Sequence, residues 1–487
     1  MHPVIVILLV LLGAVVLLCA VCAVRAAVIG KKPSGASPAI SWTPEEAALY
    51  ADRLCEMVRI PTVSKKQGED YPEFRRLQDK MRSLFPLTFG KAEWHELDGN
   101  ILLRIPGAAP KRGGTLLMGH QDVVPAAQKE WTCEPFAGIV KDGCVWGRGA
   151  MDCKSTLCSE FSAVEELLRD GFVPKEDLWL FSSRNEENSG GGSELAAAYL
   201  KEHGYQINIV LDEGGAVVDG IFPGLQSPCS AIGLVEKGFC NVKFIARGKG
   251  GHASTPPKNT PLVRLAKFVA QAEKKNLFPK KMLTPIPEMF REISPYLPFY
   301  FRFVLGNLWL FRPLVTALLP LFSPMAGAFV ATTAAFTMCG GSDTPNVLPD
   351  EAYVIANIRP SVHQNADESI AALKKLAEKY DVEVEVLMQR DASGTTSPES
   401  EEFRFLQKCL NEALPDTIVT PYMMTGGTDS RQFELVCDHV LRFTPTRLTA
   451  EQLAAMHAAN ENIGVEAVAE AVKFYRYYLE KLNERAG

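Results

Sequence analysis

The chain has 487 residues, 47% of them hydrophobic, and a formal net charge of −6 at pH 7. This length allows more than one packed domain, and because charges of both signs are interspersed without a basic stripe, the composition argues against nucleic-acid binding. The 12 scattered cysteines are typical of a reducing compartment rather than of a disulfide framework.

The N-terminal segment is apolar. Residues 4–24 carry no charge and, at about 1.5 Å per residue, are long enough to cross a bilayer as a helix. No basic residue precedes them, so we expect a retained single-pass membrane anchor rather than a cleaved signal, followed by a linker at 25–43. Basic residues follow the span, and the positive-inside rule therefore favours a cytoplasmic catalytic domain.

Three short apolar runs, at 115–120, 178–183 and 207–212, are typical of buried strands. Each run ends at or just before a residue that could bind a metal ion. Between the first two, residues 154–171 place apolar side chains on one helical face. This alternation predicts an α/β domain with a largely parallel sheet, in which ligands bind outside the carboxyl ends of the strands.

Two imidazoles and three carboxylates of metal-binding type lie in one order along the chain. Such a set can hold two divalent ions that share one carboxylate. Each motif alone could be a turn, a solvated acidic pair, a strand end or a surface histidine, but their joint occurrence favours one site. The candidate ligands are His120, Asp152, Glu187, Asp212 and His457, and the adjacent carboxylates of Asp122 and Glu186 are free to move protons.

Residues 227–392 are predicted to form an inserted second domain, which divides the catalytic domain into 44–226 and 393–487. The order of its expected elements is similar to a ferredoxin-like α+β unit. These elements are strands near 230–247, a helix near 261–274, strands near 331–340 and 351–359, a helix near 366–380 and a strand near 382–389.

The segment 295–322 inside this domain is unusually apolar and aromatic. It contains Arg302 and Arg312, which argue against a simple membrane span. Three interpretations remain open: a buried helical pair, which we favour, an acyl-chain pocket, and a lipid-facing patch.

The motifs GHQDVVP, WGRGAMDCK, LDEGG, GHAS, GGTDSR and HAANE together resemble the di-zinc metallopeptidase family of aminoacylase, carboxypeptidase S and glutamate carboxypeptidase, from residue 44 to 482. The residues of these motifs are most similar to those of the branch that contains carboxypeptidase S and the fatty-acyl amino acid hydrolases. The resemblance implies a zinc-peptidase catalytic domain and a lid domain that also forms a homodimer. Secreted or lumenal members of this branch weigh against a cytoplasmic location.

Carried over by position, the resemblance implies two Zn²⁺ per chain, and Co²⁺ or Mn²⁺ would suit the same ligands. Asp152 would bridge the two ions. One site would be completed by His120 and Asp212, and the other by Glu187 and His457.

The same resemblance assigns catalytic roles. Glu186 matches the general base, and Asp122 matches the acid that orients His120. His252 matches a histidine that reaches a neighbouring subunit's site, with a turn histidine as the alternative. A cis peptide is implied at Asp152–Cys153.

Positions that match the family's substrate-binding residues are Asn346, Arg359, Gly426, Gly427 and Thr428. An arginine fork suits a carboxylate, although Arg359 could equally form a surface ion pair and the glycines a simple turn. The chain departs from the family pattern at Asn185, where aspartate is usual, and after His457, where the sequence continues Ala-Ala-Asn-Glu-Asn.

The sequence therefore predicts a metallohydrolase that cleaves an amide beside a free α-carboxylate, either as a carboxypeptidase or as an N-acyl-amino-acid hydrolase. A dipeptidase or an N-acetyl amino acid deacylase is an alternative within the same chemistry. A catalytically silent metal-binding homologue is the alternative from another class, and it would usually have lost a ligand or the base.

Overall fold

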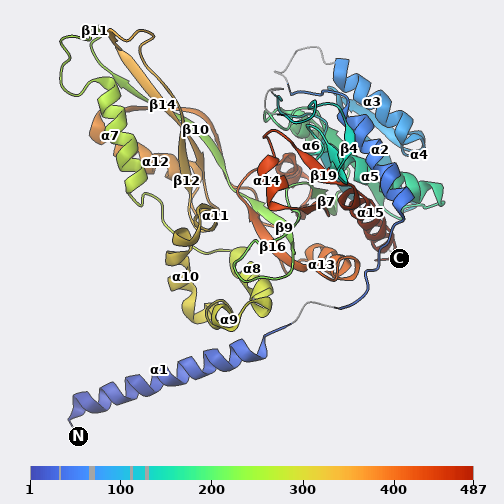
Figure 1. Ribbon diagram of the computed structural model, residues 1–487, viewed down its shortest axis with the longest axis horizontal. Coiled ribbons are helices and arrows are strands. Elements are labelled where there is room, and N and C mark those ends of the chain that lie inside the picture. Colours follow the sequence, from blue (N-terminus) through green and yellow to red (C-terminus); the bar gives the residue numbers. More distant parts are fainter. Residues whose placement is uncertain (1, 32–34, 65–71, 110–112, 127–130, 486–487) are drawn as a thin grey trace.

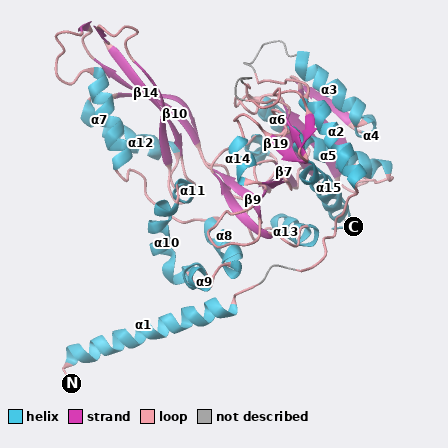
Figure 2. Cartoon of the chain, in the orientation of Figure 1, coloured by secondary structure: helices cyan, strands magenta, loops and turns pink. Residues whose placement is uncertain are grey.

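The computed structural model describes residues 2–485, except 32–34, 65–71, 110–112 and 127–130 (Figure 1). The chain forms a large α/β domain and a smaller domain to one side, and the N-terminal helix α1 (Pro3–Val28) projects from the body (Figures 1 and 2). Part of the predicted linker, 32–34, lies outside the described residues.

The large domain is built on one long sheet. Its central strands are buried along their whole length, because both faces are covered. The strands lie in the order β1 (Glu93–Leu97), β2 (Asn100–Ile105), β6 (Asp177–Ser183), β3 (Gly114–His120), β7 (Ile209–Asp212), β17 (Val440–Arg442), β9 (Cys229–Glu236), β8 (Val217–Val218) and β18 (Arg447–Leu448), and β16 (Ile418–Met424) pairs with β9.

This sheet is mixed, whereas the sequence predicted a largely parallel one. β3 is parallel to both β6 and β7, as expected. β1 and β2 are antiparallel because a two-residue turn joins them, in which Asp98 and Gly99 have φ of 52° and 77°. β9 is also antiparallel to β17 and β8. Periodicity locates a strand but does not give the direction of its partners.

Helix α5 (Lys154–Arg169) is buried on almost every side, between the sheet and two further helices. One of these is α2 (Pro44–Val58), which begins with a capping box between Thr43 and Glu46. The other is α15 (Val465–Arg485). The remaining helices of this domain are α3 (Pro72–Leu84), α4 (Pro86–Lys91), α6 (Gly192–Glu202), α13 (Glu401–Ala413) and α14 (Ala450–Ala455).

A small three-stranded sheet links two distant segments of the chain. β5 (Cys144–Trp146) pairs with both β4 (Ile139–Lys141) and β19 (Asn462–Gly464). This pairing holds the HAANE motif, which immediately precedes β19, beside the WGRGAMD motif that follows β5.

The smaller domain is an antiparallel sheet covered by helices, and the elements predicted from the sequence are present. The chain leaves the large sheet after β9, so the smaller domain begins near Lys237 rather than at 227. Its strands lie in the order β12 (Thr333–Gly340), β14 (Glu351–Arg359), β10 (Phe239–Arg247) and β15 (Glu383–Arg390), with helices α7 (Pro261–Lys274) and α12 (Ala366–Ala377) and the short pair β11 (Gly251–His252) and β13 (Val347–Leu348).

The apolar insertion forms α9 (Phe299–Leu305) and α10 (Leu308–Phe322), and it is flanked by α8 (Ile286–Ile293) and α11 (Pro324–Ala328). They share a separate hydrophobic core with β16. A buried pair was the favoured interpretation, but α10 is buried along one side only. Val315 and Leu319 are in the core, whereas Leu321 and Phe322 are 80% and 70% exposed.

Candidate metal centre

Three of the predicted site segments meet at one edge of the large sheet. His120 is the last residue of β3, Asp212 is the last residue of β7, and Glu186 and Glu187 follow the end of β6. Because these three strands are parallel neighbours, their carboxyl ends lie together. The predicted placement of these polar residues beyond the strand ends is therefore confirmed.

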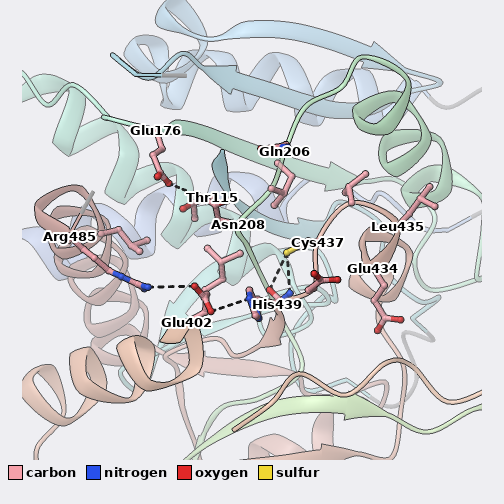
Figure 3. A pocket seen from close by; sticks show the side chains of 15 residues that line it. Thr115, Glu176, Gln206, Asn208, Glu402, Glu434, Leu435, Cys437, His439 and Arg485 are labelled. Atoms are coloured by element: carbon pink, nitrogen blue, oxygen red, sulfur yellow. Dashed lines mark hydrogen bonds and ion pairs between the residues drawn. The ribbon is translucent and has the colours of Figure 1, made fainter. Parts of the chain in front are cut away.

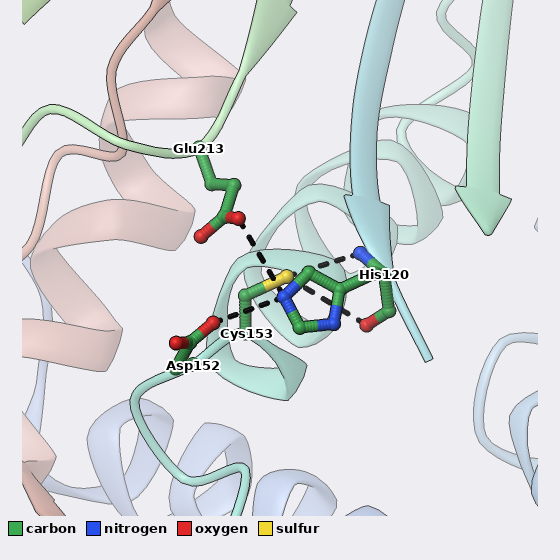
Figure 4. Close-up of side chains that lie close together, drawn as sticks. All are labelled: His120, Asp152, Cys153 and Glu213. Atoms are coloured by element: carbon green, nitrogen blue, oxygen red, sulfur yellow. Dashed lines mark hydrogen bonds and ion pairs between the residues drawn. The ribbon is translucent and has the colours of Figure 1, made fainter. Parts of the chain in front are cut away.

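Two groups of potential metal ligands share Asp152. The first contains His120, Asp152, Cys153 and Glu213 (Figure 4), and the second contains Asp152, Glu187 and His457. The ligand atoms of each group lie within 4.8 Å of one another. Among the residues that the structure describes, Asp152 is thus the one carboxylate that belongs to both groups.

The geometry around Asp152 is specific. Its Oδ1 lies 2.9 Å from Nε2 of His120, and its Oδ2 lies 3.0 Å from Nε2 of His457. Nε2 of His457 is also 3.1 Å from Oε2 of Glu187. The Asp152–Cys153 peptide is cis, as the resemblance implied.

Glu213, rather than Asp212, projects into this cluster. Oε1 of Glu213 lies 3.5 Å from Nε2 of His120 (Figure 4). The carboxylate of Asp212 instead accepts a hydrogen bond of 3.1 Å from the backbone N–H of Ser430. Successive side chains of a strand point to opposite faces, so only one of these two adjacent acids can face the other ligands.

Asp122 connects two of the site segments. The carbonyl oxygen of Asp122 lies 2.9 Å from Nδ1 of His120, which leaves Nε2 for the cluster. Its carboxylate accepts the backbone N–H groups of Glu186 at 3.2 Å and Glu187 at 3.1 Å. Burial raises the pKa of Glu186 well above its ordinary value, although the charge of His120 opposes the shift.

Glu461 supports the shared carboxylate, a role that the sequence analysis did not assign. It is fully buried, and its Oε1 accepts the backbone N–H groups of Gly149, Met151 and Asp152 at 2.8–3.1 Å. Its Oε2 lies 2.6 Å from Arg148. The only signal for it in the sequence was its place within the HAANE motif.

The donor set fits a pair of divalent cations. Carboxylates and neutral imidazoles are the ligands that such ions prefer. Hydrogen bonds to Asp152 and Glu187 raise the pKa of His457 to about 10, so the pocket favours positive charge. Oε1 of Glu187 is buried without a hydrogen-bond partner among the described residues, and a cation would satisfy it.

The smaller domain holds candidate residues that do not join this cluster within one chain. His252 is exposed on β11, at the far tip of the smaller domain in Figure 1, with its Nδ1 2.8 Å from Ser254 Oγ. Asn346 is exposed beside it, because its carbonyl accepts Ala253 N–H. Arg359 ends β14, where its guanidinium lies 4.6 Å from the ring centre of Phe239.

The GGTDS loop approaches the cluster from the other side. Thr428 donates a 2.8 Å hydrogen bond to Glu236 and is itself buried. A side chain at Gly426 would meet open space, whereas one at Gly427 would lie 3.3 Å from Glu236. The loop is therefore held against the end of β9, next to the connection into the smaller domain.

A separate pocket lies at the opposite edge of the sheet. It has a volume of about 590 Å³, and Thr115, Asn208, His439 and Arg485 are among its lining residues (Figure 3). Thr115 and Asn208 lie at the amino ends of β3 and β7. Because active sites of such sheets lie at the carboxyl ends, this pocket is not the predicted site.

Comparison with known proteins agrees with this geometry. Residues 116–481 match the description Peptidase family M20/M25/M40. The N-fatty-acyl-amino acid synthase/hydrolase of Bos taurus is 31% identical over 456 residues, covering 90% of this chain and 89% of that protein. Carboxypeptidase S of Saccharomyces cerevisiae is 25% identical and covers 89% of this chain and 84% of its own.

Solved structures share the fold. A metallo-carboxypeptidase of Sulfolobus solfataricus superimposes with a TM-score of 0.66 at 20% identity, covering 89% of this chain and 99% of that one. Human carnosine dipeptidase 1 gives a TM-score of 0.64 at 15% identity, covering 90% and 97%. The similarity to both structures extends over the large and the smaller domain together.

Proposed function

The chain belongs to peptidase family M20/M25/M40 and is a metallohydrolase, and we propose that it is a di-zinc enzyme that cleaves an amide beside a free α-carboxylate. The substrate is an N-acyl amino acid or a peptide that releases its C-terminal amino acid. The observation that carries the proposal is the pair of ligand groups joined through Asp152. Glu186 directly precedes the ligand Glu187, and the charges of His120 and Glu213 both act on its carboxyl.

Two divalent ions bound there would acidify a shared water molecule and polarise the scissile carbonyl. Glu186 takes the proton from the water and returns it to the leaving amine. Its burial suits this role, because the raised pKa of its carboxyl favours holding a proton. Asp122 fixes the backbone of Glu186 and Glu187 together, so the base keeps its distance from a metal ligand.

His120, Asp152 and Glu213 would hold the first ion, and Asp152, Glu187 and His457 would hold the second. Asp212 then acts indirectly, by holding Ser430 of the GGTDS loop. In the proposed complex, backbone donors at Gly426, Gly427 and Thr428 bind the substrate carboxylate together with Arg359. Glu236, which accepts the Thr428 hydroxyl, fixes this loop.

Among possible substrates, a long-chain N-acyl amino acid is favoured over an N-acetyl amino acid or a dipeptide. The support is the similarity to the Bos taurus N-fatty-acyl-amino acid synthase/hydrolase over almost the whole of both chains. A catalytically silent homologue is disfavoured, because every ligand position and the base are filled.

The smaller domain is proposed to act as a lid and as the dimer surface. Its edge strand β12 is open, and Met338 on it is 59% exposed. Strand β11, which carries His252, lies at the far tip of the smaller domain and away from β7 (Figure 1), and Asn346 accepts the N–H of the next residue, Ala253. In this proposal the two residues serve the site of a second copy, where His252 stabilises the oxyanion.

Helix α1 is proposed to be a membrane anchor with the catalytic domain on the cytoplasmic side. Within the described residues it is the single unbroken helix that is long and apolar enough to span a bilayer, and it is almost wholly exposed. Labelling of intact cells with a membrane-impermeant thiol reagent tests on which side of the membrane the catalytic domain lies. Modification of the exposed Cys339 would place the domain outside instead.

The test of the function is Glu186→Gln compared with Glu187→Gln, both made in the full chain. We expect Glu186→Gln to keep two metal ions and to lose at least about 10³-fold in kcat. Glu187→Gln should lose metal, which elemental analysis would measure. Assays with N-acetyl, long-chain N-acyl and dipeptide substrates then rank the substrates. Full activity of Glu186→Gln would contradict the proposed mechanism.

A further inference from the structure

Helix α10 is apolar on both of its sides, but only one side is packed. Val315 and Leu319 face the core that the insertion shares with α8 and β16. Six large apolar residues of this helix are 37–80% exposed: Trp309, Leu310, Leu314, Leu318, Leu321 and Phe322. We call these six residues the α10 face.

Four residues of the α10 face form a continuous stripe along the helix. Leu310, Leu314, Leu318 and Leu321 follow one another at helical spacings of four, four and three. Leu314 and Leu321 are 51% and 80% exposed, and Leu310 and Leu318 are 37% and 38% exposed. A water-soluble surface rarely presents so many large apolar side chains along one helix, so the stripe indicates a binding surface.

Helix α9 connects the α10 face to the C-terminal end of α1, because α9 contacts both α1 and α10 (Figures 1 and 2). The fully buried Asn307, which precedes α10, joins the two. Its Oδ1 accepts Arg25 Nε at 3.1 Å, and its Nδ2 donates to the carbonyl of Cys22 at 3.1 Å. The backbone N–H of Lys31 donates to the carbonyl of Pro295 at 2.8 Å.

These contacts fix the insertion at the point where a bilayer that holds α1 would end. Cys22 and Ala26, at 0% exposure, are the buried positions of α1, whereas residues 3–21 of this helix are exposed and are free to meet lipid. The helices α9 and α10 together are also apolar enough to span a membrane, but they are bent by 99°. A bent apolar pair suits the surface region of a bilayer rather than a crossing.

The charges of the insertion are compatible with this location. Residues 299–328 contain Arg302 and Arg312 but no aspartate or glutamate. Arg312 donates to the carbonyl of Met282 and is thus turned toward the protein. A pocket of about 820 Å³ at the junction is lined by Arg25, Lys31 and Trp309, as well as by acidic residues of α8. Trp309 is the residue type that is enriched at membrane interfaces.

We propose that the α10 face inserts into the same phospholipid bilayer that holds α1, so that the enzyme is attached to the membrane at two points. This inference rests on the proposed anchor. Together with the hydrogen bonds between α1 and Asn307, the second attachment would fix the orientation of the body on the membrane. It would also place the insertion where amphiphilic substrates concentrate.

The test uses the full chain in phospholipid nanodiscs and the fluorescence of Trp309. The chain has six tryptophans, so the Trp309 contribution is the difference between wild type and Trp309→Phe. We expect lipids with brominated acyl chains to quench at least about half of this contribution, since interfacial helices insert about 5–10 Å deep. Aqueous iodide should have little effect on it.

A matched control moves the probe to the body. Val173, which is 63% exposed in the large domain, is changed to tryptophan in the Trp309→Phe background, and this tryptophan should respond to iodide but not to brominated lipid. The exposed pair Leu314→Glu and Leu318→Glu should abolish lipid quenching of Trp309 without unfolding, because neither side chain is in the core.

Three results would overturn the inference. Quenching of Trp309 by iodide alone would place the α10 face in water while leaving the anchor intact. Protection from both quenchers in a chain that elutes as a dimer would mean that a second copy covers it. A chain that does not join the nanodisc at all would reject both the anchor and the second attachment. Loss of hydrolysis in Glu186→Gln concerns the proposed function alone.

Discussion

At the scale of single residues, the centre depends on which of two adjacent acids faces inward. Asp212 and Glu213 are adjacent at the end of β7, and their side chains leave the backbone on opposite sides. Burial and the charge of Glu213 raise the pKa of Asp212 to about 7. The contacts separate the two acids, because Asp212 accepts the backbone N–H of Ser430 at 3.1 Å whereas Oε1 of Glu213 lies 3.5 Å from Nε2 of His120.

The two acids therefore give a discriminating pair of variants. Glu213→Gln should lower the metal content from about two ions per chain to about one, because its side chain is the one beside His120. Asp212→Asn should retain both ions and reduce activity by about 10–100-fold through the loop. Elemental analysis after dialysis measures the first effect. The reverse assignment would show metal loss in Asp212→Asn instead.

At the scale of elements, the buried helix α5 contains two acidic side chains in different surroundings. Glu160 and Glu165 are both buried in it. The carboxylate of Glu165 accepts the backbone N–H groups of Leu87 at 3.1 Å and Thr88 at 2.8 Å, at the start of α4, as well as the Thr88 hydroxyl at 2.9 Å. No described residue makes a hydrogen bond to either oxygen of Glu160. Burial, followed by the charge of Asp212, raises the pKa of Glu160 well above its ordinary value.

Because Glu165 accepts hydrogen bonds and Glu160 does not, replacing each with glutamine should change the free energy of unfolding in opposite directions. Because the folded state holds the proton on Glu160, stability is complete below the unfolded pKa of about 4.3 and falls as the pH rises above it. Glu160→Gln should thus raise the free energy of unfolding by about 1 kcal/mol or more at pH 8, and by little at pH 4. Urea unfolding at both pH values measures this.

Glu165→Gln is the matched control within the same helix. It replaces a charged acceptor of three hydrogen bonds and should lower the free energy of unfolding by about 1.5–3 kcal/mol at pH 8. If Glu160→Gln were also destabilising at pH 8, Glu160 would be ionised and paired in the native protein, contrary to the raised pKa.

At the scale of the whole molecule, the smaller domain raises the question of which site it serves. His252 is exposed at its tip, far from the cluster of the same chain (Figure 1). A dimer in which each chain supplies His252 to the other would explain this placement, because closed twofold symmetry uses the same surface of both copies.

Complementation tests this arrangement. Glu186→Gln and His252→Ala should each be nearly inactive alone. When they are co-expressed, a mixed dimer has one site with both residues intact, so the population should recover about a quarter of wild-type kcat. No recovery, with mixed dimers verified by mass, would mean that His252 serves its own chain or none.

The sequence by itself determined the family, the order of the elements and most of the candidate site. Strand ends followed by polar residues located His120, Glu186, Glu187 and the Asp212–Glu213 step, because a buried strand is a continuous apolar run. The helix at 261–274 and the strand at 351–359 were predicted with the bounds that α7 and β14 have. The anchor candidate followed from composition alone.

Only the tertiary structure decided the relative direction of the strands, the side to which Glu213 points and the exposure of α10. The mixed sheet depends on which strands pair, and Glu213 faces the cluster because of how β7 sits between β3 and β17. The support of Asp152 by Glu461 depends on the pairing of β5 with β19, two segments that are more than 300 residues apart. Whether an apolar helix is covered depends on its neighbours, and α10 is covered along one side only. These features come from contacts between distant segments, which local residue patterns do not encode.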